Sequence, residues 1–196
     1  MWTIAFKEAS SFFSSLAGFI ISGVFLLVMS LMLFFFLDSS ILTGNYANMD
    51  GLFYMAPTIF TFIIPAITMR FFAEELQNGT MELLATKPIS DFKIICGKFI
   101  AGLFLICICL IPTIIYFYTV YQLGSPKGNL DIGGIMGSYV GLFFLSATFL
   151  SIGIFASSLT HNQVVAFVIG TFLCFICQWF FLYISKIPVF VGKIDF

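Results

Sequence analysis

The charged side chains of this 196-residue chain gather in one stretch, from Arg70 to Lys98. It holds eight of the seventeen Asp, Glu, Lys and Arg residues. Arg70 and Glu74 stand four positions apart, the spacing of an ion pair on one helical face. The chemistry that these residues offer is ion pairing and docking, because no nucleophile, base or metal-ligand pattern accompanies them.

Helix-breaking residues divide the stretch into short pieces. Gly79 is expected to end a first helix, since glycine adopts the left-handed conformation without strain. Thr80 is expected to cap a second short helix, with Glu82 favoured in its first turn by the helix dipole. Pro88 ends that helix, because the residue before a proline is pushed out of the helical region. Lys98, after re-entry into an apolar segment, is expected to extend its ammonium back to the interface.

This division into short helices favours a docking element over a flexible connector. Glu74 and Glu75 are expected to point into the cytoplasm, and Leu83 belongs to a small apolar knob. The alternative interpretation is a solvated loop at the membrane surface that binds no partner.

Other chemistry-bearing residues are isolated. His161 is the single histidine and lies in a turn, so a polar turn residue is the expected role. Cys174 and Cys177 lie inside an apolar helix, where a redox or zinc role is improbable. A nucleotide-binding loop is not found, because Gly97-Lys98 is followed by Phe99 and lacks the first glycine. We therefore expect no catalytic residue, no metal and no cofactor in this chain.

The rest of the chain is predicted to lie in a membrane. Hydrophobic residues make up 61% and charged residues 9%, against about 25% charged residues in soluble domains. About 20 apolar residues cross a bilayer as a helix. The prediction is an all-α, polytopic, single domain over 1–196, with a helix in the plane of the interface over 1–15 and a cytoplasmic loop over 70–94. The five predicted spans are 16–37, 52–69, 95–121, 135–157 and 164–185.

The N-terminal helix is predicted from its two faces. Trp2, Phe6 and Ala9, followed by Phe13 and Leu16, recur at helical spacing opposite Lys7 and several hydroxyl residues. A helix of this kind lies among lipid headgroups with its aromatic side chains inward.

Prolines and glycines indicate where the spans deviate or approach each other. Pro57 and Pro65 predict kinks or a break in the second span, and Pro112 a kink in the third. Gly133, Gly137 and Gly141 form a small-residue face on the fourth span, suited to packing within one subunit or to dimerisation.

The basic residues set the predicted orientation. With the N-terminus in the cytoplasm, five basic residues lie inside and three outside, in modest agreement with the positive-inside rule. No charged residue lies in the middle of a predicted span. Because ion-coupled transporters usually need ionisable groups there, the sequence argues against coupling to an ion gradient. Energy for transport would therefore have to come from a partner that binds the 70–98 region. The net charge of −1 provides no basic surface for nucleic acid.

The charged stretch resembles the cytoplasmic loop of ABC-2 type transporter permeases. The residues that carry this resemblance are Met69-Arg70, Glu74-Glu75, Gly79-Thr80, Glu82-Leu83-Leu84, Thr86, Pro88-Ile89 and Gly97-Lys98. A second turn is similar to the one that precedes the fifth span of those permeases, with Ser157-Ser158-Leu159-Thr160 and Asn162-Gln163. Within the family, the loop looks most like the permease of the gliding-motility-associated ABC transporter of Bacteroidetes.

The resemblance implies an ABC-2, type V exporter-like permease fold in a bacterial inner membrane. It implies a coupling site for a separate ABC ATPase, which would bind the ATP and magnesium. The coupling residues would be Arg70, Glu74, Glu75, Gly79, Thr80, Glu82, Leu83, Pro88 and Lys98, with Asn162 and Gln163 in the second turn. Further implied partners are a second permease copy or a sister permease, an auxiliary membrane protein with an exterior domain, and membrane lipid. The family has a sixth span, which is expected beyond this sequence.

Three functions remain open at this point. The first is the permease subunit of an exporter or of an ATP-driven gliding-motility or secretion machine. The second is a structural membrane anchor of a motility complex, through which nothing is transported. The third, a passive channel or ion-coupled carrier, is disfavoured by the uncharged spans.

Overall fold

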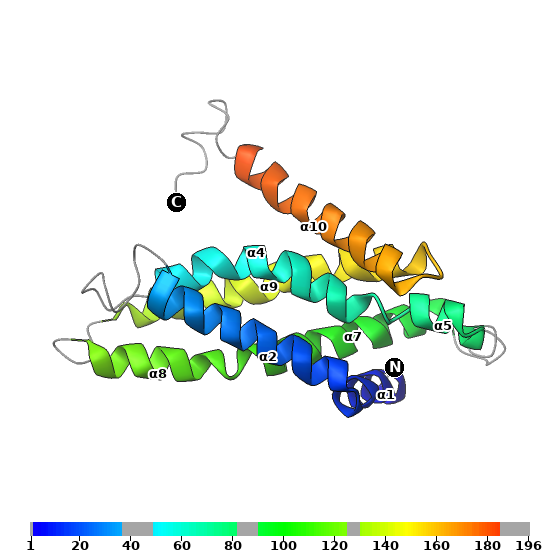
Figure 1. Cartoon of the computed structure of the whole chain (residues 1–196), viewed down its shortest axis with the longest axis horizontal. Helices are drawn as coiled ribbons and strands as arrows, with labels where there is room; N and C mark the ends of the chain where they lie inside the picture. The colour runs from blue at the N-terminus through cyan, green and yellow to red at the C-terminus, as the bar shows by residue number, and fades with distance from the viewer. Residues whose placement is uncertain (1, 37–48, 82–89, 125–129, 185–196) are drawn as a thin grey trace.

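A computed structural model describes residues 2–36, 49–81, 90–124 and 130–184, and throughout these parts the chain is helical and contains no strand (Figure 1). The elements are α1 (Trp2–Ser14), α2 (Leu16–Leu31), the π-helix η1 (Met32–Phe36), α4 (Asp50–Thr68), α5 (Ala73–Gln77), α7 (Asp91–Leu110), α8 (Thr113–Leu123), α9 (Ile132–Ser158) and α10 (Gln163–Ile184).

Five helical segments in this part of the chain are long and apolar enough to cross a membrane. They are Gly18–Phe35, Asp50–Gln77, Asp91–Leu123, Ile132–Ser158 and Gln163–Phe180. The prediction of an all-α fold with five spans is confirmed. The sixth span and the sides of the membrane on which the loops lie stay predictions.

The spans form a bundle, with the shorter helices α1 and α5 at one end. Helices α2, α4, α9 and the α7–α8 pair run along the long axis, and α10 is inclined to them (Figure 1). Helix α1 turns across the bundle at the end where α5 lies and packs on α7. We call this end, with α1, α5 and the adjoining ends of α4, α7 and α9, the α5 end.

Two glycines allow close contacts between spans. A Cβ atom on Gly153 of α9 would lie 2.2 Å from the Thr68 hydroxyl of α4, and one on Gly102 of α7 would lie 2.4 Å from the Leu150 side chain. By contrast, Gly137 and Gly141 have nothing within 4 Å of a built Cβ. Among the described residues, Gly137 and Gly141 of the predicted small-residue face are therefore not used for helix packing, and use of that face in a dimer stays a prediction.

The prolines act differently in the two spans. Pro112 divides the third span into α7 and α8, as predicted, because proline lacks the amide that would continue the helical hydrogen bonds. In the second span α4 continues as one helix through Pro57 and Pro65, so the predicted break is not found at either residue. The helix ends three residues after Pro65, where a turn leads into α5.

Helix α1 is present as predicted, but a different face of it is buried. Ala5, Ala9 and Phe12 face the protein, whereas Trp2 and Phe6 are 79% and 78% exposed. The small alanines let α1 lie close to α7, while the rings of Trp2 and Phe6 are left on the outer surface. Placement of α1 among lipid headgroups stays a prediction.

Candidate functional site

The structure brings six of the predicted coupling residues together at the α5 end. Arg70 lies in the turn after α4, Glu74 and Glu75 lie in α5, and Gly79 and Thr80 follow it. Lys98 reaches the same region from α7. Three other predicted residues lie outside the described part of the chain: Glu82, Leu83 and Pro88.

Lys98 is the centre of a buried ionic cluster. Its side chain is fully buried, and its Nζ lies 3.1 Å from Glu8 Oε1 and 2.9 Å from Glu75 Oε2. The ammonium also donates a hydrogen bond to the Phe71 carbonyl and lies 4.9 Å from the centre of the Phe72 ring. Two carboxylates, a carbonyl and an aromatic face replace water around the charge, which would otherwise be costly to bury.

This cluster corrects two predictions. The ammonium of Lys98 is not exposed, as that of a side chain extended to the membrane interface would be, because Glu8 and Glu75 bind it inside the protein. Glu75 does not point into the cytoplasm, since its side chain is only 16% exposed and faces Lys98, while Glu74 remains 42% exposed. The cluster joins α1, α5 and α7 through one lysine.

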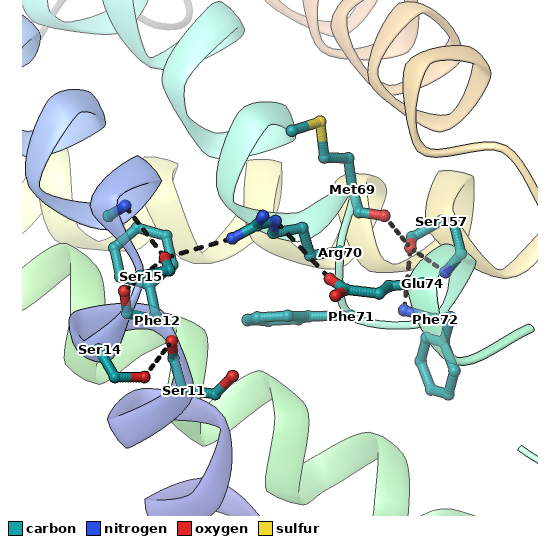
Figure 2. Close-up of polar contacts among 12 residues, drawn as sticks. Ser11, Phe12, Ser14, Ser15, Met69, Arg70, Phe71, Phe72, Glu74 and Ser157 are labelled. Atoms are coloured by element: carbon teal, nitrogen blue, oxygen red, sulfur yellow. Dashed lines mark hydrogen bonds and ion pairs between the residues drawn. The ribbon is translucent and has the colours of Figure 1, made fainter. Parts of the chain in front are cut away.

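Arg70 connects the turn after α4 with the corner between α1 and α2. Its Nη1 donates to Ser15 Oγ at 3.2 Å, and its Nε lies 3.6 Å from Glu74 Oε2, so the predicted pair with Glu74 is present (Figure 2). Ser15 is also the cap of α2: its hydroxyl donates to the Phe12 carbonyl and accepts from the Gly18 amide. Arg70 therefore binds the residue that sets the angle between the first two helices.

Ser157, in the last turn of α9, holds the junction between α4 and α5. Its buried hydroxyl donates to the Met69 carbonyl at 3.1 Å and accepts from the Phe72 and Ala73 amides at 3.0 and 3.1 Å (Figure 2). These backbone groups have no helical partner because one helix ends and the next begins there. One side chain from the second turn therefore stabilises the first loop.

The tip beyond α5 is the exposed part of the site. Gly79 has a φ of +67°, which confirms the predicted left-handed helix stop. Residues 77–80 are all exposed. The Thr80 hydroxyl turns back and donates to the Glu75 carbonyl, so it bonds to the preceding helix; the rest of the helix that it was predicted to cap lies outside the described residues.

Asn162 and Gln163 lie at the start of α10. The Asn162 side-chain oxygen accepts from the Val164 amide at 2.9 Å, so Asn162 caps α10. Asn162 is exposed and Gln163 is half-buried. Their predicted part in coupling stays a prediction.

Sequence reasoning missed Glu8, Ser15 and Ser157 as parts of the site. The sequence did contain an indication for Glu8, since it lies between Ala5, Ala9 and Phe12 on what proves to be the buried face of α1. For Ser157 the sequence indicated only that it lies in the second turn. Among the described residues, no group of three His, Cys, Asp or Glu could hold a metal ion. The contacts described above are ion pairs and hydrogen bonds to backbone groups.

Comparison with known proteins gives one match. A family model described as "ABC-2 family transporter protein" matches residues 2–188. No curated protein and no solved structure matches the chain.

Proposed function

The chain belongs to the ABC-2 family transporter proteins, and from this premise we propose that the α5 end receives an ABC ATPase and passes its movement to the spans. Members of this family are the membrane permease subunits of ABC transporters. The nucleotide and its magnesium ion would then be bound by the ATPase and not by this chain.

The observation that carries the proposal is the combination of an exposed tip with buried attachments. Residues 77–80 are open to a partner, whereas α5 directly before them is tied to its surroundings by Glu75 and by the Ser157 bonds to its first amides. A push on the tip would therefore move a helix that is joined to α4 through the chain, to α7 through Lys98 and to α9 through Ser157.

We propose that this movement rocks the spans against each other in a dimer of permeases. Packed elements that are fixed at one end respond to displacement as rigid bodies. The second permease would be another copy or a sister chain. The middle of each span carries no charged residue, which suits a lipid-like or amphipathic cargo. The setting that we propose is export, or a gliding-motility or secretion machine, in the bacterial inner membrane. The N-terminus would lie in the cytoplasm, and an auxiliary membrane protein would be a further partner.

Co-purification with the ATPase tests the docking site. Gly79→Val should abolish or strongly reduce capture, because a β-branched residue is strained at a φ of +67°. Gly79→Asn is the matched control, since asparagine tolerates this conformation and a built Cβ at Gly79 meets nothing within 4 Å. Equal capture of the ATPase by both variants would contradict docking at the tip.

A structural anchor that transports nothing is the second candidate, because it would need the same docking tip. ATP-driven movement of labelled lipid in liposomes containing both subunits would favour the permease. If ATP hydrolysis drove assembly of the complex and no lipid or amphipathic probe moved, the result would favour the anchor.

A further inference from the structure

A polar cavity lies beside the ionic cluster, between α1 and the junction of α4 with α5. Its volume is about 550 Å³, within the usual range for small-molecule sites. Helix α1 contributes Lys7, Glu8 and several serine hydroxyls to its lining. The junction on the opposite side contributes Arg70 and the carboxylates of Glu74 and Glu75. Figure 2 shows Ser11 and Ser14 on the α1 side, with Arg70 and Glu74 on the other.

The groups in the cavity keep unused hydrogen-bonding capacity. The Arg70 Nε is buried and has no hydrogen-bond partner, and its distance to Glu74, 3.6 Å, is that of an ion pair without a hydrogen bond. Lys7 is 69% exposed and lies 3.8 Å from Glu75. Arg70 and Glu74 can therefore each bind a further group of opposite charge.

The balance of charge in the cavity selects the kind of ligand. Two basic residues and three acids line it, and the ammonium of Lys98 lies directly behind Glu8 and Glu75. The charges thus cancel, so the cavity as a whole does not attract a bare anion. The neighbouring basic and acidic groups, above all Arg70 and Glu74, match a zwitterion with an anionic group and an ammonium a few atoms apart.

The position of the cavity indicates where this zwitterion comes from. Ser14 and Ser15 line the cavity, and α2 begins at the next residue, Leu16, which is 78% exposed. Phe19, one turn further along this span, is 62% exposed. The cavity therefore lies at the boundary between a charged surface and an apolar span, the depth at which lipid headgroups meet acyl chains.

We propose that this cavity binds a phosphoethanolamine group, carried by a membrane phospholipid. The phosphate would accept hydrogen bonds from Arg70 and the α1 hydroxyls, and the primary ammonium would donate to Glu74. A trimethylated ammonium cannot donate such bonds, so phosphatidylcholine should bind less tightly. The acyl chains would follow the exposed apolar surface of α2. The proposal goes beyond ATPase docking and does not depend on it.

Native mass spectrometry of the delipidated full chain in detergent tests the site. The probes are dioleoyl phosphatidylethanolamine, phosphatidylcholine and phosphatidylglycerol, together with free phosphoethanolamine and inorganic phosphate. Phosphatidylethanolamine should bind about tenfold more tightly than the other two lipids, the effect of one charge-assisted hydrogen bond. Equal binding of the three lipids would overturn the proposal. Free phosphoethanolamine or phosphate that binds as tightly as the lipid would overturn its assignment to a membrane lipid.

Matched variants locate the binding. Ser11→Phe should fill the cavity and reduce phosphatidylethanolamine binding about tenfold, whereas Ser10→Phe on a neighbouring exposed position of α1 that does not line the cavity should leave it unchanged. Glu74→Gln should remove the preference over phosphatidylcholine, while Lys93→Gln, an exposed charge outside the cavity, should keep it. Equal effects within either pair of variants would overturn the proposed site. None of these measurements includes the ATPase, so failure here leaves the docking proposal standing.

Discussion

The two halves of the bundle are held by different interactions. At the α5 end a buried lysine joins α1, α5 and α7 through charged partners, and Ser157 joins α9 to the backbone between α4 and α5. In the far half, built from α8 and the first turns of α9, the described contacts between helices include neutral hydrogen bonds. There the Tyr139 hydroxyl lies 3.0 Å from Thr113 Oγ1, and Tyr116 donates to the Leu26 carbonyl at 2.8 Å.

The contrast shows where the molecule fixes its geometry. Charge-assisted bonds have strict distances and directions, whereas apolar packing with single neutral hydrogen bonds tolerates small shifts. The α5 end is thus the half in which helices keep their relative positions. Substitutions of the polar contacts at the α5 end should therefore lower stability more than comparable substitutions in the far half.

Replacing the buried lysine should have the largest effect. Lys98→Met leaves Glu8 and Glu75 without their cation and should lower the free energy of unfolding by about 3–5 kcal/mol. Thermal unfolding in detergent measures this loss. Lys93→Met, which changes an exposed lysine of the same helix, is the control and should unfold near the wild-type temperature. Equal unfolding temperatures for the two variants would remove the basis of the comparison.

Ser157→Ala should rank second. It leaves the Met69 carbonyl and two amides without a partner in a buried place, at a cost of about 3 kcal/mol, the upper end of the range for such groups. Ser158→Ala is matched to it, because the exposed Ser158 hydroxyl bonds only to the Phe155 carbonyl of its own helix. Chemical denaturation in detergent compares the two, and a loss of stability of similar size in both would contradict the assigned role.

A pair of glycine substitutions compares the halves directly. Gly153→Ala places a Cβ 2.2 Å from Thr68 Oγ1 and should lower stability by about 2 kcal/mol through overpacking. Gly137→Ala in the first part of α9 meets nothing within 4 Å and should lack this penalty. The unfolding midpoints and, for Gly137→Ala, the oligomeric state by light scattering are the measurements. A milder effect at Gly153 than at Gly137 would reverse the comparison.

The smallest effect is expected in the far half. Tyr139→Phe removes one neutral hydroxyl from its contacts with Thr113 and should lower stability by about 1 kcal/mol. Tyr118→Phe, at an exposed position of α8, is the matched variant and should be neutral. A loss at Tyr139 as large as that of Lys98→Met would show that both halves are fixed equally firmly.

The parts of the fold that sequence reasoning found are those with local causes. Long uncharged runs indicated the five spans, Pro112 divided the third span, and Gly79 ended α5. Each of these features follows from the chemistry of one residue or of one continuous segment. The sequence therefore predicted the outline of the bundle.

The parts that it missed depend on contacts between distant segments. Lys98 and Glu8 are 90 positions apart, and no local pattern pairs a lysine near the start of one span with an acid in another helix. The expected exposure of Glu75 was wrong for the same reason, because helical periodicity does not show which neighbour covers a face. Ser157 was part of a recognised turn, but its role depends on the junction that α9 places beside it.

The break at Pro112 divides the third span into two helices that are held by different neighbours. Helix α7 carries Lys98 and shares the ionic cluster, while α8 is joined to α2 through Tyr116. Because the regular helical hydrogen bonds are interrupted at residues 111 and 112, α7 and α8 can change direction relative to each other there. The α8 part of the third span can therefore follow α2 without disturbing the contacts that hold α7 at the α5 end.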